Sequence, residues 1–102
     1  MRRQEITPEL RAHLARYREL SDRVEALIAR WPRLTDEART RKTELTHELN
    51  DTLREVGGYV PGSTLKDILR GAIHFLEGED AFGEEVPNRD KIDRLIEAIL
   101  KD

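Results

Sequence analysis

The chain has 102 residues, of which 37% are apolar and 38% are charged, and its formal net charge is −3. This length supports one domain with a single core, and the apolar share is above that of disordered chains. Cysteine is absent, which excludes disulfides, thiolate metal sites and cysteine nucleophiles. No apolar run approaches the roughly 20 residues that cross a bilayer, and MRRQEITPEL lacks the apolar core of a secretory signal, so we expect a cytoplasmic protein.

The first expected helix covers about residues 8–31. Thr7 is a favourable cap, Pro8 suits the first helical position, and apolar residues then recur with a helical period. Trp31 ends this helix because it precedes Pro32, and a residue before proline avoids the helical region. The apolar stripe is broad, so we expect the helix to contact two neighbours.

The second expected helix covers about residues 36–56 and starts from the same kind of cap, Thr35. Its apolar stripe is thin and interleaved with threonines, so packing against a partner must hold it more than intrinsic propensity does. The stripe consists of Leu45, Leu49, Leu53 and Val56. Because the connection to the first helix is short, we predict that the two helices fold back on each other as an antiparallel hairpin.

The stretch GGYVPGST, residues 57–64, has glycine spacing similar to that of a phosphate-binding loop. Such a loop needs a lysine to hold the phosphates and a buried strand before it. Here Ser63 occupies the lysine position, and a long helix precedes the stretch. We therefore interpret residues 57–63 as a hinge loop, in which the glycine pair ends one helix and Ser63 or Thr64 caps the next.

Two shorter helices are expected in the last part of the chain. The third covers residues 64–77, with Gly78 as its stop, and an acidic loop follows over residues 77–87. Asn88 then caps a fourth helix over residues 89–101. No segment has the alternation or the composition of a strand.

These elements predict an all-α fold: a long antiparallel helical hairpin plus two shorter helices, arranged like a four-helix bundle. We expect residues 1–102 to form a single domain. It would contain an N-terminal arm (1–6), the hairpin (8–56), the hinge loop (57–63) and a two-helix C-terminal part (64–102). Two copies of the hairpin could also bury their stripes against each other in a homodimer.

The sequence offers no assembled catalytic or metal site. His13, His47 and His74 fall on three different expected helices, and no pair has the spacing of a helical ligand motif. The pattern Glu-x-x-His occurs once, from Glu44 to His47, whereas a di-iron bundle requires two copies. His13 shares a row with leucines, which predicts a histidine at the edge of the core. We predict no catalytic residue, no metal and no cofactor.

One run on the third expected helix resembles a known motif. Residues 74–78, HFLEG, are similar to the H-x-L-K-G motif of histidine phosphotransfer proteins, which are also small helical bundles. The resemblance implies His74 as the phosphorylated residue. Glu77, however, stands where the family has a lysine, and its charge would repel a phosphoryl group. Phosphotransfer around His74 is therefore a remote alternative.

The composition and patterns favour a small protein–protein interaction module, such as an adaptor, an inhibitor or an accessory subunit, without catalytic activity of its own. The candidate contact residues lie in the hinge and in the acidic loop, where apolar side chains stand near carboxylates. They are Tyr59, Val60, Phe82, Glu84 and Glu85. Phe82 has a second interpretation, as a plug that folds back onto the bundle.

A nucleic-acid-associated regulator is the alternative function. The front of the chain is basic and the back is acidic, and several bases lie close to the expected hairpin turn. They are Arg30, Arg33, Arg39, Arg41 and Lys42. Clustered at the turn, they would neutralise several phosphates. Acidic residues interleave with them along the same helices, which is typical of a solvated face.

Overall fold

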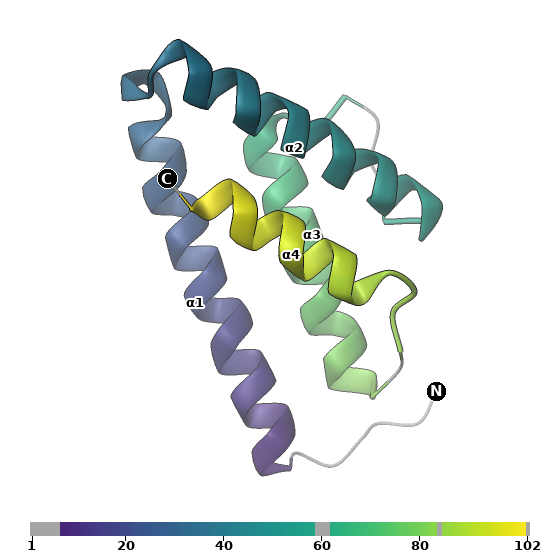
Figure 1. The fold of residues 1–102 in the computed structure, drawn as a ribbon. Helices are drawn as coiled ribbons and strands as arrows, with labels where there is room; N and C mark the ends of the chain where they lie inside the picture. The colour runs from purple at the N-terminus through teal and green to yellow at the C-terminus, as the bar shows by residue number, and fades with distance from the viewer. Residues whose placement is uncertain (1–6, 59–61, 84, 102) are drawn as a thin grey trace.

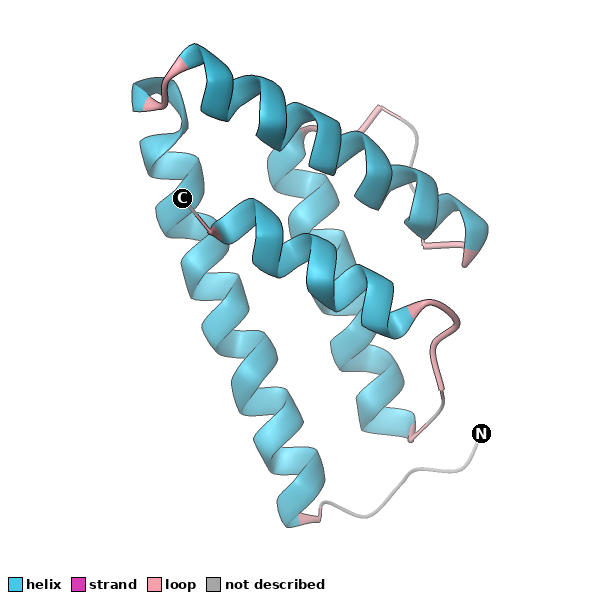
Figure 2. Cartoon of the chain, viewed as in Figure 1, coloured by secondary structure: helices cyan, strands magenta, loops and turns pink. Residues whose placement is uncertain are grey.

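The computed structural model describes residues 7–58, 62–83 and 85–101, without the side chains of residues 80–82. The described chain forms four α-helices and one 3₁₀ turn and contains no strand (Figure 2), which confirms the all-α prediction. The elements are α1 (Pro8–Arg30), η1 (Trp31–Arg33), α2 (Asp36–Glu55), α3 (Leu65–Phe82) and α4 (Arg89–Leu100).

Local capping places most helix ends where the sequence predicts them. The hydroxyl of Thr7 accepts a hydrogen bond from the Leu10 amide at 3.1 Å, and that of Thr35 accepts one from the Ala38 amide at 3.2 Å. At the end of α2, Gly57 adopts a left-handed φ of 79°. The Gly58 amide then donates to the Leu53 carbonyl at 2.8 Å, which completes a Schellman motif.

The third helix is longer than predicted. Gly78 lies inside α3, which continues to Phe82 and ends at Gly83, where φ is 69°. A glycine ends a helix when it adopts the left-handed conformation, and Gly83 does so whereas Gly78 does not. The first half of the expected acidic loop is therefore helical. Asn88 precedes α4 as predicted, but its side chain donates to Glu55 at 3.5 Å instead of capping the helix.

The helices pair in an order that differs from the predicted hairpin. α1 packs mainly against α3, and α2 packs mainly against α4, each pair running antiparallel, with the second pair laid across the first (Figure 1). α1 and α2 diverge from their short connection and share little contact along their lengths. Between them, η1 is followed by Leu34 in an extended conformation, with φ −74° and ψ 151°.

A single core forms between these crossed pairs and draws on all four helices. Its members are Tyr17, Leu20, Val24, Leu27, Leu45, Leu49, Leu53, Leu69, Ala72, Ile73, Leu76, Val86, Ile92, Leu95, Ile96, Ile99 and Leu100. The apolar stripe of α1 is thus covered within one copy of the chain. A homodimer built on that stripe would find its surface already occupied. None of the helices in the described part of the chain combines the length and the apolarity that crossing a bilayer requires.

Candidate functional site

A pocket of about 380 Å³ lies where η1 joins α1 to α2 and meets the carboxyl end of α4. We call it the corner pocket. Its lining residues are Arg30, Arg33, Leu34, Thr35, Ala38, Arg41, Lys42, Ala98 and Lys101. The volume falls in the range of roughly 300–1,000 Å³ that is typical of ligand-sized sites.

The apolar part of the corner pocket is made by Leu34, Ala38 and Ala98, all of which are half-buried. Trp31, the sole tryptophan of the chain, is also half-buried and lies in the same 3₁₀ turn that leads to Leu34. Among the described residues, Trp31 and Leu34 belong neither to the core nor to the apolar side chains packed against it. Leu34 therefore brings to the corner apolar surface that lies outside the core, whereas Ala98 also packs against the core.

The charged part of the corner pocket has one sign. Five of its lining residues are basic, and none of the described lining residues is acidic. Arg30, Arg33, Arg41 and Lys101 are exposed. Arg41 lies 3.7 Å from the Glu44 carboxylate, but both side chains are about two-thirds exposed (66% and 65%), so this pair is weak.

Lys42 does not fit the predicted nucleic-acid contact. It is only 3% exposed, and its ammonium donates hydrogen bonds to the backbone carbonyls of Ile99 and, at 3.4 Å, of Lys101. The last carbonyls of a helix lack partners within the helix, so Lys42 satisfies the end of α4. The sequence carries a signal for this burial, because Lys42 lies three residues before Leu45 and seven before Leu49 on the apolar stripe.

The remaining bases of the predicted turn cluster divide into two groups. Arg30, Arg33 and Arg41 line the corner pocket, whereas the Arg39 guanidinium donates to the Pro32 carbonyl and braces the turn. A separate depression on α2 is lined by Asp36, Glu37, Thr40, Arg41 and Glu44. The start of α2 is therefore basic toward the pocket and acidic on an adjoining face.

The predicted partner-binding residues lie elsewhere. Tyr59, Val60 and Glu84 fall outside the described residues, and Phe82 ends α3 with a side chain that is not described. Glu85 is exposed and lies before α4, at the opposite end of that helix from the corner pocket. The sequence analysis did not single out the corner pocket. Its signal in the sequence was a tryptophan, Trp31, with Arg30 and Arg33 close to it in the chain.

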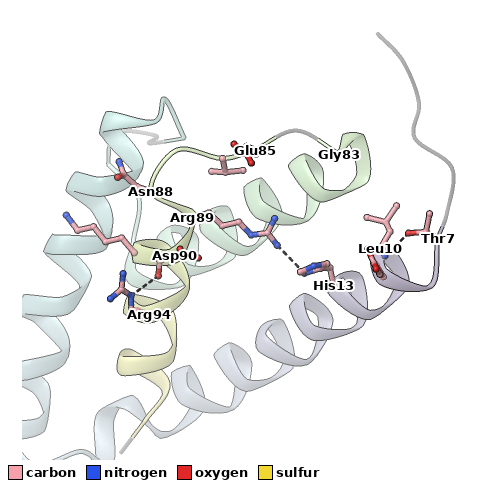
Figure 3. A pocket seen from close by; sticks show the side chains of 12 residues that line it. Thr7, Leu10, His13, Gly83, Glu85, Asn88, Arg89, Asp90 and Arg94 are labelled. Carbon is pink, nitrogen blue, oxygen red and sulfur yellow. Dashed lines mark hydrogen bonds between the residues drawn. The ribbon is translucent and has the colours of Figure 1, made fainter.

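A larger pocket, of about 720 Å³, lies between the start of α1 and the connection from α3 to α4 (Figure 3). Unlike the corner pocket, it is lined by charges of both signs. They are Glu9, Glu85, Asp90, Arg89, Lys91 and Arg94. Arg89 is one of its lining residues, and its guanidinium donates to the Tyr17 hydroxyl. The same guanidinium lies 3.2 Å from Nδ1 of His13 (Figure 3).

A group of polar and charged side chains connects α1 to α4, and we call it the α1–α4 seam. It consists of Arg16, Tyr17, Arg89, Asp93 and Glu97. Tyr17 is fully buried, and its ring lies 5.8 Å from the Arg16 guanidinium and 5.5 Å from that of Arg89. Arg16 donates to Glu97 at 2.6 Å and to Asp93 at 3.2 Å. Burial alone would lower the pKa of Arg16, but its hydrogen bonds and attraction to these carboxylates outweigh burial and raise the pKa.

The histidines do not form a site together. His13 is exposed beside Arg89 and is not the core-edge residue that the row of leucines predicts. His47 and His74 are exposed on α2 and α3, and Glu44 is exposed as well. In the described ranges, no group of three or more potential metal-ligating side chains comes together.

The two pockets thus differ in chemistry: the one in Figure 3 surrounds contacts within the fold, whereas the corner pocket combines apolar surface with charge of one sign. Comparison of the chain with protein-family models, with curated proteins and with solved structures gave no match.

Proposed function

We propose that this protein is a small helical protein–protein interaction module, an adaptor, inhibitor or accessory subunit of the cytoplasm, that binds its partner through the corner. The observation that supports the proposal is an apolar pocket edged by arginines, at the turn of the chain that also carries the half-buried Trp31. Tryptophan and arginine are the residues most enriched among those that dominate binding energy at protein interfaces.

The fold itself gives little reason for these residues to be at the corner. Trp31 and Leu34 lie apart from the core, although apolar side chains normally gain stability by joining it. The exposed bases Arg33 and Arg41 line the pocket with no described acid among its walls. A partner that covers the corner would bury the apolar surface and neutralise the charge in one step.

Nucleic acid is the other class of partner that exposed arginines attract. A phosphate backbone that extends beyond the pocket would be repelled by Asp36, Glu37 and Glu44 on the adjoining face of α2, whereas a short segment of a protein can stay over the pocket. Two of the five bases predicted for this role, Arg39 and Lys42, are engaged by backbone carbonyls. These contacts favour the protein partner.

The test is a comparative pull-down from a lysate of the source organism, with and without nuclease. Three baits are compared: the natural chain, the corner variant Arg33→Glu plus Arg41→Glu, and the control variant Arg11→Glu plus Arg18→Glu. All four arginines are exposed, and both double variants change the net charge equally, but Arg11 and Arg18 lie on α1 away from the corner pocket.

We expect a protein that is retained by the natural chain and by the control variant, survives nuclease, and is lost from the corner variant. Identical retention by all three baits would contradict a corner interface. Retention that disappears with nuclease would replace the proposal with the nucleic-acid alternative. Circular dichroism of each bait verifies that the substitutions leave the helices intact.

A further inference from the structure

We infer that the corner pocket receives an acidic segment of the partner protein, in which one apolar side chain is flanked by carboxylates. This inference rests on the proposed function and specifies its partner chemistry. It combines two properties of the pocket: its positive charge and its apolar surface. Different residues provide each property.

The charge of the lining points to carboxylates. Arg30, Arg33, Arg41 and Lys101 are exposed around the pocket, and its described walls contain no acid. Guanidinium groups pair with carboxylates through two parallel hydrogen bonds, which gives such contacts direction as well as strength. Lys42 also lines the pocket, but its ammonium is engaged by the end of α4, so we assign the recognition to the exposed Arg33 and to Arg41, whose pair with Glu44 is weak.

The apolar surface points to a side chain and not to a bare anion. Leu34, Ala38 and Ala98 provide it, and the two alanines leave space that larger residues would fill. A free phosphate or a polyanionic backbone gains nothing from such a surface, whereas a leucine or phenylalanine gains free energy in proportion to the area it buries.

The neighbouring face of α2 restricts how the segment can lie. Asp36, Glu37 and Glu44 would repel its carboxylates, so the segment is directed away from that face, over the pocket between η1 and the end of α4. The bases of the pocket attract the carboxylates of the segment, and the acids of α2 repel them. Together they determine where the segment lies as well as the charge it must carry. Because the paired charges are exposed, the affinity should fall as the salt concentration rises.

The probe is a short synthetic peptide with a central leucine between glutamates. Two matched peptides accompany it: one with glutamines in place of the glutamates, and one with serine in place of the leucine. Trp31 is the only tryptophan, so its fluorescence reports events at the corner, and titration calorimetry detects binding that leaves the fluorescence unchanged.

We expect the glutamate–leucine peptide to bind saturably. Each matched peptide should bind at least about tenfold more weakly. Arg33→Glu plus Arg41→Glu should weaken the first peptide by at least about tenfold, because it places like charges opposite the carboxylates. Ala38→Leu fills the pocket while keeping every charge, and should weaken the same peptide. Arg11→Glu plus Arg18→Glu should bind as the natural chain does.

Equal binding of the serine and leucine peptides would overturn the inference, because the corner would then only collect anions. Equal binding of the glutamine peptide would overturn it as well, because charge would play no part. If the pull-down finds a protein at the corner while the glutamate–leucine peptide does not bind, the inference fails and the proposed function stands. If no protein depends on the corner, both fail.

Discussion

The α1–α4 seam and the corner are built from similar residues and differ in what surrounds them. Each contains arginines and an aromatic residue. In the seam, Tyr17 is fully buried and Arg16 is matched by Asp93 and Glu97 from the neighbouring helix. At the corner, Trp31 is half-buried, and the neighbouring helix contributes Ala98 and Lys101 instead of carboxylates.

This difference shows how the role of an arginine depends on the helix that faces it. Where the facing helix supplies acids, as α4 does along the seam, the charges are satisfied by folding. At the corner the facing helix end supplies an alanine and another base, and there we propose that a partner protein supplies the complement. Three experiments on stability would sharpen or break this comparison.

The largest contrast should appear when the two aromatic residues are truncated. We expect Tyr17→Ala to lower the free energy of unfolding by about 3–5 kcal/mol, because it removes a fully buried ring and the partner of Arg89. Trp31→Ala should cost no more than about 1 kcal/mol, because Trp31 lies apart from the core. Urea denaturation followed by circular dichroism measures both values, and equal losses would place Trp31 in the core.

The next contrast is between two lysines beside the carboxyl end of α4, Lys42 from α2 and Lys101, whose substitution should change the stability by different amounts. We expect Lys42→Met to cost about 1.5–3 kcal/mol, since hydrogen bonds to a charged group are lost and the α4 carbonyls are left without a partner. The exposed Lys101→Met should stay within about 0.5 kcal/mol.

Thermal unfolding provides the measurement for the lysines. For a domain of this size, each 1 kcal/mol lowers Tm by about 4–8 °C, so the two variants should separate clearly. Similar Tm values would mean that the end of α4 does not hold the Lys42 ammonium, which would then be available to a ligand of the corner pocket that Lys42 lines.

The smallest contrast concerns arginines in the two regions. Arg16→Met should cost about 1 kcal/mol or less at low salt, because Arg16 is 38% exposed and such pairs are partly screened. It also removes the guanidinium that donates to Asp93, whose Oδ1 is buried without a described hydrogen-bond partner. Arg33→Met, at the corner, should leave the stability nearly unchanged.

Salt distinguishes these last two variants. The loss caused by Arg16→Met should shrink as ionic strength rises, because screening weakens the pair in the natural chain. The small effect of Arg33→Met should show no such trend. A salt-dependent loss of stability from Arg33→Met would reveal an ion pair within the fold and would weaken the case for an external partner.

Much of the local structure could be predicted from the sequence. The starts of α1 and α2 follow from Thr7 and Thr35, and the end of α2 follows from the glycine pair, because a cap involves only residues a few positions apart. The end of α3 was missed because two glycines, Gly78 and Gly83, competed, and only backbone conformation separates them.

The candidate site was less accessible to sequence reasoning. Arg30, Arg33 and Arg41 were grouped correctly near the turn, but Ala98 and Lys101 lie more than fifty residues away in the chain. Their arrival at the corner depends on the packing of α4 against α2. The same packing buries Lys42, so one unpredicted helix contact both removed a residue from the predicted cluster and created the pocket.

The sequence by itself determined an all-helical chain, most of its helix boundaries and the apolar stripes that form its core, because these depend on period and on neighbours within a turn or two. Only the tertiary structure decided that α1 pairs with α3 and α2 with α4, that Lys42 is internal, and that apolar surface and bases meet at the corner. Helix pairing depends on how whole faces of distant segments fit together, and adjacency along the chain does not specify that fit.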